Sequence, residues 1–164
     1  MTRGSRSRAL RPVGLGFADT APVLLVFSAR MAAPPADVHR ALAEEVEAWP
    51  RWFRAVTLAR QVERAGRRGR EIRLVGLARF TETVVAVEPA ARYAYRVDVT
   101  NMPGPRALLE DWRLAPAGGG TLLEWRIAVD VPAVWKPVFR LVRPVLGHAF
   151  RDSVRALDRR LAAV

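Results

Sequence analysis

The stretch from residue 56 to residue 131 is a succession of short apolar runs separated by turn residues, and this pattern constrains the fold more than any other feature of the chain. Within residues 93–99 and 121–131, large apolar side chains alternate with polar ones, which is the period of a β-strand with one buried face. Glycine and proline mark breaks at residues 101–105 and 118–120. Connections this short join neighbouring antiparallel strands, so we predict an antiparallel meander.

Two short helical segments are predicted after the first strand of the chain. The Pro34-Pro35 pair suits the first turn of a helix with one apolar face, and residues 49–53 form a short helical turn or a loop. Residues 64–70, rich in glycine and arginine, are predicted to be a turn between two strands. The predicted strands cover residues 23–30, 56–62, 71–78, 80–87, 93–99, 107–114 and 121–131.

The last stretch of the chain changes to the period of a helix. Apolar residues recur there every three or four positions, which predicts a long amphipathic helix. Pro144 interrupts the helical hydrogen bonds, so we expect the helix to kink or restart at that point. From residue 144 to the end, such a helix would be about 31 Å long at ~1.5 Å per residue, enough to cross the face of a sheet. The apolar positions are Val142, Leu146, Phe150, Val154, Leu157, Leu161 and Val164.

The size and charge of the chain suggest its organisation. With 164 residues, of which 51% are hydrophobic, the chain has the size of one domain with a real core. Residues 1–18 contain four arginines and no acid, so we expect a flexible basic arm before a single folded domain over 19–164. No apolar run is long enough for a signal peptide or a membrane-spanning helix, so a cytoplasmic protein without a membrane span is expected.

Nucleic acid is a natural partner to consider because the formal net charge is +11. Basic clusters occur at residues 64–70 and along the C-terminal helix. The first cluster contains no aromatic side chain that could stack on a base. Only Lys136 is a lysine among the 27 basic residues, a bias typical of a GC-rich genome. Nucleic acid is therefore an unlikely partner, although a regulator associated with ribosomes or RNA stays open as an alternative.

Three stretches of the chain resemble one superfamily. They are residues 33–38 with the Trp49-Pro-Arg-Trp52 segment, residues 80–95, and residues 110–129, which contain Glu110-Asp-Trp112-Arg-Leu114 and the triple-glycine turn. In this order they resemble the SRPBCC superfamily, which includes START-type lipid-transfer proteins, pollen-allergen-like proteins and bacterial polyketide cyclases/dehydrases. The resemblance covers residues 23–164.

The resemblance implies an α+β helix-grip fold. In that fold a curved antiparallel sheet of about seven strands wraps around a long C-terminal helix, with two short helices after the first strand. Members of the superfamily bind lipids, sterols, polyketides or plant hormones in an apolar cavity between sheet and helix, and some catalyse cyclisation or dehydration. The resemblance implies no cofactor. It suggests a hydrophobic small-molecule ligand for this chain, which would be a monomer or a homodimer.

Two carboxylates are the candidates for chemistry in such a cavity. Glu110 shares a strand face with the apolar Leu108 and Trp112, and Glu82 lies on the same kind of face in its own strand. A carboxylate in an apolar cavity needs a charged partner or a raised pKa, and Arg73 or Arg96 is the expected partner. The pair would anchor a ligand or act as acid and base. The alternatives are a structural ion-pair network and an exposed position after a one-residue shift of the face.

The remaining candidates are aromatic. Large aromatic side chains suit a ligand pocket, although they equally suit a packed core. The two histidines are not candidates for catalysis. His39 lies among polar residues, which predicts a surface position, and His148 lies beside the apolar stripe, which predicts a core or rim position. No cysteine is present and no residues have the spacing of metal ligands. The predicted ligand-contacting residues are Trp112, Trp125, Tyr93, Tyr95, Arg73 and Phe150.

The function that these features favour is a non-enzymatic one. We expect the chain to bind a lipid or a polyketide-like molecule in an internal cavity, as a carrier or a sensor. A cyclase or dehydratase that uses Glu82 and Glu110 is the first alternative.

Overall fold

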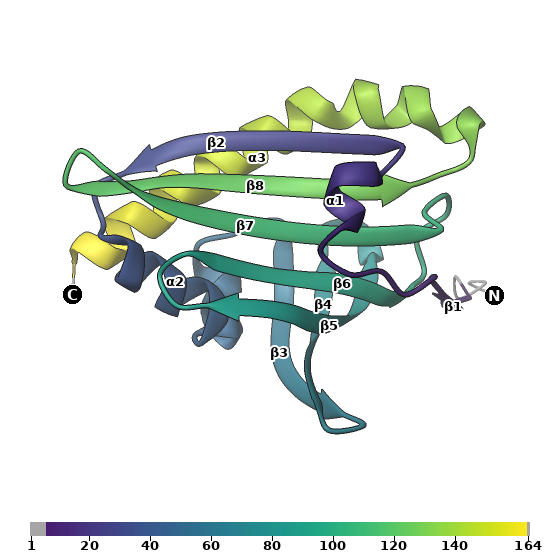
Figure 1. Ribbon diagram of the computed structural model, residues 1–164, viewed down its shortest axis with the longest axis horizontal. Coiled ribbons are helices and arrows are strands. Elements are labelled where there is room, and N and C mark those ends of the chain that lie inside the picture. Colours follow the sequence, from purple (N-terminus) through teal and green to yellow (C-terminus); the bar gives the residue numbers. More distant parts are fainter. Residues whose placement is uncertain (1–5, 164) are drawn as a thin grey trace.

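The computed structural model describes residues 6–163 and has the predicted helix-grip architecture (Figure 1). Each of the seven predicted strands lies within a few residues of its expected range, the basic turn is shorter than expected, and β1 was not predicted. The strands are β1 (Arg8–Ala9), β2 (Val23–Met31), β3 (Val56–Arg64), β4 (Arg67–Leu74), β5 (Arg79–Glu88), β6 (Arg92–Thr100), β7 (Ala107–Ala117) and β8 (Gly120–Asp130). The helices are α1 (Phe17–Thr20), α2 (Pro35–Ala43), the 3₁₀ helices η1 (Val46–Arg51), η2 (Val75–Leu77) and η3 (Ala133–Trp135), and α3 (Lys136–Ala162).

The sheet is antiparallel throughout, with the strand order β2-β8-β7-β6-β5-β4-β3. Consecutive strands from β3 to β8 are neighbours, as short turns require. The first long strand, β2, pairs with the last, β8, so that α2 and η1 connect the two edges of the sheet. The strand faces predicted from the alternation are confirmed, because Tyr93, Tyr95 and Trp112 lie in the core beneath the sheet.

The helix α3 packs against the concave face of the sheet but is buried over only half its length. Its C-terminal half buries Phe150, Val154 and Leu157, whereas no residue from 136 to 146 is fully buried. The 27 residues span about 40 Å at ~1.5 Å per residue. The helix continues through Pro144 without a restart, and Figure 1 shows that it changes direction along its length.

The segment before β2 corrects the expectation of a flexible arm over residues 1–18. Residues 1–5 lie outside the described residues, but the segment after them is attached to the sheet. β1 pairs with β6 through Arg8↔Thr100 and Ala9↔Val99, beyond the last β6–β7 pair at Arg96. The side chains of Leu10 and Val13 are buried. The segment is ordered because β6 offers free backbone groups where β7 diverges, and because apolar residues on the outer face of the sheet need a cover.

Leu10→Ala tests whether this segment belongs to the folded structure. We expect the free energy of unfolding to fall by about 2 kcal/mol, since a buried leucine is truncated. Urea denaturation measures the change, with the exposed Arg6→Ala as a control that should change little. A flexible arm would instead leave the stability of both variants equal to that of the unmodified chain.

Candidate functional site

A cavity of about 180 Å³ lies between the concave face of the sheet and α3. Its walls are almost entirely apolar and come from every layer of the fold. Where the sheet forms the floor, three polar side chains of β4, β5 and β7 reach the cavity, namely Arg70, Glu82 and Glu110. The other lining residues include Trp49 and Phe53 near η1, Met102 and Pro105 between β6 and β7, Tyr95, Trp125 and Ile127 on strands, and Phe139, Leu146 and Ala149 on α3.

Four polar side chains run across the cavity floor from strand to strand, and we name Arg70, Glu82, Tyr95 and Glu110 the polar stripe. The register of the sheet brings them together. Arg70 on β4 lies directly opposite Glu82 on β5, and Tyr95 on β6 lies directly opposite Glu110 on β7. Directly opposed side chains in an antiparallel pair are within contact distance. All four side chains point to the concave face, and the guanidinium of Arg70 over the ring of Tyr95 joins the two pairs.

Arg70 and Glu82 form a fully buried ion pair. The Nε and Nη2 atoms of Arg70 each lie 2.7 Å from Oε2 of Glu82, and both side chains are 2% exposed. The guanidinium also lies over two aromatic rings, 3.7 Å from the ring centroid of Tyr95 and 4.4 Å from that of Trp49. Hydrogen bonds and ring faces replace part of the water that the buried charge has lost, and Nη1 of Arg70 is left without a hydrogen-bond partner among the described residues. The pair therefore anchors one end of the polar stripe.

Glu110 is held by three aromatic side chains and still faces the cavity. Its Oε2 atom accepts hydrogen bonds from the hydroxyl of Tyr95 (2.7 Å) and from Nε1 of Trp125 (2.9 Å). Trp112 donates in turn to the Tyr95 hydroxyl (3.0 Å), which fixes the direction of the Tyr95 proton toward Glu110. The second carboxylate oxygen, Oε1, accepts no hydrogen bond from the residues that the structure describes. Glu110 can therefore accept one further hydrogen bond on the cavity side.

The two carboxylates have raised pKa values. Burial raises the pKa of Glu82 to about 7; Arg70 opposes this effect and the charge of Glu110 adds to it. Burial also raises the pKa of Glu110, against the hydrogen bond from Tyr95. Two acids share one guanidinium in a site with little water, which disfavours the charged form of both. The polar stripe can thus accept hydrogen bonds and can also exchange a proton.

The predicted aromatic residues divide into two groups. Tyr95 and Trp125 line the cavity. The other three, Trp112, Tyr93 and Phe150, are fully buried and lie behind its surface. The rings of Trp112 and Trp125 stack with their centroids 5.0 Å apart, and Phe150 stacks on Trp125 at 5.9 Å. In this arrangement the buried rings hold the two lining rings in place.

The expectation that Arg73 contacts the ligand is wrong. Arg73 is exposed, because β4 turns it to the outer face, and Arg96 pairs with Asp98 instead of a cavity carboxylate. The observed partner of Glu82 is Arg70, which lies in the segment that the sequence predicts to be a turn. The turn consists of Ala65 and Gly66 only, and both residues have positive φ angles. β4 therefore begins at Arg67. The alternation of Arg70 with Ile72 was the signal that could have identified it.

Other sequence expectations also change at this stage. His39 is buried and its Nε2 donates to the carbonyl of Arg92 (3.2 Å), whereas His148 is exposed. The basic cluster at residues 64–70 is reduced, since Arg70 is buried and Arg64 pairs with Glu71.

Within residues 6–163 no group of potential ligands could hold a metal ion. No described helix is long and apolar enough to cross a membrane.

Comparison with known proteins agrees with the fold and the cavity described above. Residues 24–164 match the family model described as polyketide cyclase/dehydrase and lipid transport. The chain belongs to this family. The uncharacterized protein Rv2574 of Mycobacterium tuberculosis is 30% identical over 150 residues, which cover 90% of this chain and 89% of that protein.

Solved structures of SRPBCC superfamily proteins share the fold of this chain. A START superfamily protein from Mycobacterium smegmatis has a TM-score of 0.66 at 16% identity, covering 85% of this chain and 97% of that one. The major latex-like protein 151 of Panax ginseng has a TM-score of 0.68 at 11% identity, covering 84% and 96%. At these identities the likeness concerns the fold. Binding of a hydrophobic ligand is typical of this superfamily.

Proposed function

We propose that the chain binds a hydrophobic small molecule, lipid-like or polyketide-like, in the cavity and acts as a carrier or a sensor. The observation that carries this proposal is an apolar cavity whose floor presents one unoccupied acceptor atom, Oε1 of Glu110. Pockets for small molecules combine apolar walls with a few polar groups that orient the ligand. The ligand would therefore have an apolar body and a hydroxyl or another hydrogen-bond donor.

The size of the cavity limits the apolar part of the ligand. A volume of about 180 Å³ accommodates a ring or a short chain and is below the ~300 Å³ of typical ligand pockets. Aromatic walls fill the remaining space, and the ring of Trp125 offers a face for stacking. A larger ligand would have to extend toward the half-buried Phe139 and Leu146 on the less packed half of α3. Both observations favour a ligand whose polar head is a ring with a donor group.

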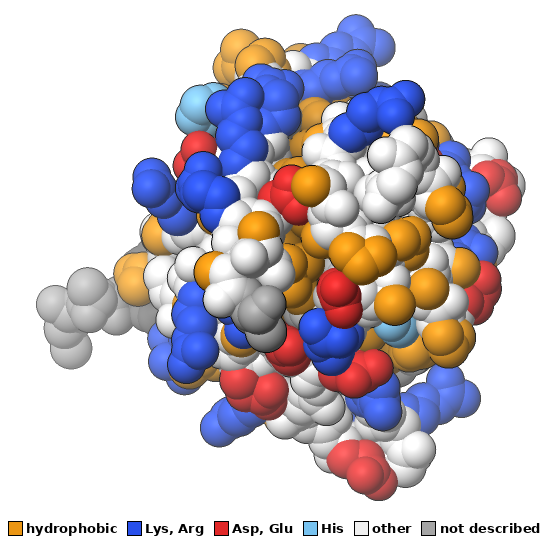
Figure 2. All heavy atoms as spheres, turned by 90° about the vertical axis from the view of Figure 1, so that its left-hand side faces the viewer, with side chains coloured by type: hydrophobic (Ala, Val, Ile, Leu, Met, Phe, Trp, Pro, Cys, Tyr) orange, Lys and Arg blue, Asp and Glu red, His pale blue; other side chains and the backbone are white. Residues whose placement is uncertain are grey.

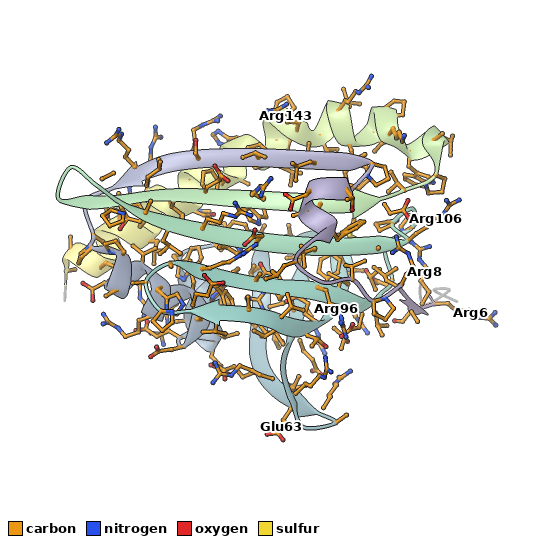
Figure 3. All side chains as sticks on the ribbon, viewed as in Figure 1. Arg6, Arg8, Glu63, Arg96, Arg106 and Arg143 are labelled. Atoms are coloured by element: carbon orange, nitrogen blue, oxygen red, sulfur yellow. The ribbon has the colours of Figure 1, made fainter. Side chains whose placement is uncertain are left out.

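A matched pair of probes tests this proposal. We expect 2-naphthol to bind about tenfold more tightly than naphthalene, because only 2-naphthol can donate a hydrogen bond to Glu110. Glu110→Leu should abolish the preference while naphthalene still binds. Isothermal titration calorimetry measures the four affinities, and Glu63→Leu, a change far from the cavity, serves as the control (Figure 3). Absence of saturable binding of either probe, or an unchanged preference in Glu110→Leu, would contradict the proposal.

A second candidate function is acid–base catalysis on a polyketide-like substrate. The specific observation in its favour is that Glu110, a carboxyl group with a raised pKa, lies at the surface of an apolar cavity beside the hydroxyl of Tyr95. A carboxyl group whose pKa is raised by burial suits the proton transfers of enolisation or dehydration. The same residue would then serve both binding and catalysis.

Proton exchange in a ketone probe distinguishes catalysis from binding alone. If Glu110 is a general acid–base, the chain should accelerate exchange of the α-protons of 2-tetralone with D₂O, and Glu110→Gln should lose about 10²-fold of that rate. Proton NMR follows the exchange, with far-UV circular dichroism as the check on folding. Exchange no faster than in buffer, or equal in Glu110→Gln, would leave Glu110 a binding residue only.

A further inference from the structure

Three segments surround the end of the cavity that Met102, Pro105 and Phe139 line, and we call them its rim. The side chain of Asn101 holds η2, donating to the carbonyl of Leu77 (3.0 Å) and accepting from the backbone N–H of Arg79 (2.8 Å). Gly104 lies against the ring of Trp135, where an added Cβ atom would be 3.0 Å from the ring. Figure 1 shows the β6–β7 loop and the start of α3 at the same end of the sheet. We name the surface formed by η2, residues 101–106 and residues 133–146 the mouth face.

The mouth face exposes large apolar side chains to solvent. Leu77 is 80% exposed, Leu141 79% and Val134 77%. Leu77 has a φ angle of 71°, which is unfavourable for a large side chain. The backbone is therefore strained at the most exposed of these residues. Single exposed apolar residues are ordinary, but a group of them on one face indicates an interaction surface. The further exposed members are Val75, Val138 and Val145.

Basic side chains lie on the other side of the same part of α3, toward the start of β2. No aspartate or glutamate occurs between Asp130 and Asp152. Within that interval Lys136, Arg140 and Arg143 are exposed and make no ion pair with any described residue. Arg143 projects from α3 into solvent and Arg106 projects at the same end as the loop (Figure 3). The opposite end of the molecule carries acidic and basic side chains side by side (Figure 2). Positive charge without an acidic neighbour in sequence therefore flanks the apolar row of the mouth face.

We propose that the mouth face docks on the surface of an anionic lipid bilayer. Exposed leucine and valine side chains can enter the headgroup region, while lysine and arginine side chains attract anionic lipids. A second copy of the chain fits poorly, because two such faces would bring like charges together in a protein of net charge +11. Docking on a bilayer does not depend on the proposed function. Its biological purpose rests on that function, since the docked protein would pass a hydrophobic ligand between the bilayer and the cavity.

Vesicle sedimentation with the full chain tests the docking. The probes are vesicles of phosphatidylcholine alone and of phosphatidylcholine with 30% phosphatidylglycerol, without any added ligand. We expect binding to the anionic vesicles only, weakened at least tenfold when NaCl is raised from 50 to 500 mM. Equal binding to both kinds of vesicle, or to neither, would overturn the proposal. The titration with 2-naphthol uses no lipid, so failure of one proposal is distinguishable from failure of the other.

Paired variants locate the binding surface. The double variant Leu77→Ser with Leu141→Ser should bind anionic vesicles at least tenfold more weakly. Its control, Val87→Ser with Leu122→Ser, removes exposed apolar side chains outside the mouth face and should bind normally.

A second pair of variants tests the charge. Arg140→Glu with Arg143→Glu should weaken binding more than tenfold, at about fivefold for each basic residue removed. Arg67→Glu with Arg68→Glu changes the net charge equally on the β3–β4 hairpin and should have a much smaller effect. Equal losses in a test variant and its control would show that docking has no defined face. A dimer in sedimentation velocity that the Leu77 and Leu141 substitutions abolish would assign the face to a second copy and overturn the proposal.

Discussion

Arg70→Met is expected to lower the free energy of unfolding by about 3–5 kcal/mol at pH 8, the cost typical of removing one partner of a buried ion pair. Methionine fills a similar space, so the loss comes from charge rather than from a void. Glu82, 2% exposed, would remain beside Glu110 without a counter-charge. Urea denaturation followed by circular dichroism measures the loss. It should be smaller at pH 5, where Glu82 is protonated and needs no partner.

Two further variants separate charge from packing in this prediction. Arg73→Met changes the same residue type at an exposed position of the same strand and should alter stability by less than about 0.5 kcal/mol. Combining Arg70→Met with Glu82→Met replaces both members of the pair and should recover much of the lost stability. If the double variant is no more stable than Arg70→Met alone, the buried charge is not the cause of the loss.

The stability of the unmodified chain is expected to fall by about 2–3 kcal/mol between pH 5 and pH 8. The pKa of Glu82 is raised from 4.5 to about 7, so the folded state binds more protons than the unfolded state in this range. Stability is therefore greatest below the unfolded pKa and is lost as the pH rises through the folded pKa. Glu71, whose pKa is lowered, loses its contribution only below pH 4.5, outside this window.

Denaturation curves at four pH values from 5 to 8 measure this slope. Glu82→Gln should flatten the profile, because the amide does not titrate. Glu71→Gln, the same substitution in the exposed ion pairs with Arg60 and Arg64, should leave the slope unchanged. A stability that is constant or increases from pH 5 to pH 8 in the unmodified chain would contradict the raised pKa of the buried pair.

Much of the candidate site was predictable because the side chains of a strand alternate between its two faces. Once Leu108 and Trp112 are assigned to the core, the inward direction of Glu110 follows, and the same holds for Glu82 beside its apolar neighbours. Arg70 was missed for a local reason. A basic, glycine-containing segment is typical of a loop, and only the two-residue turn at Ala65-Gly66 reveals that the strand begins early enough to bury this arginine.

The sequence by itself determined the antiparallel meander, the long C-terminal helix and the inward faces of the strands, since these depend on periodicities of two and 3.6 residues that each segment carries within itself. Only the tertiary structure decided which side chains meet. The pairing of Arg70 with Glu82, and of Tyr95 with Glu110, depends on strand register. The rim formed by Asn101 and Trp135 depends on how distant loops pack. Such contacts join residues far apart in the chain, and no local pattern encodes them.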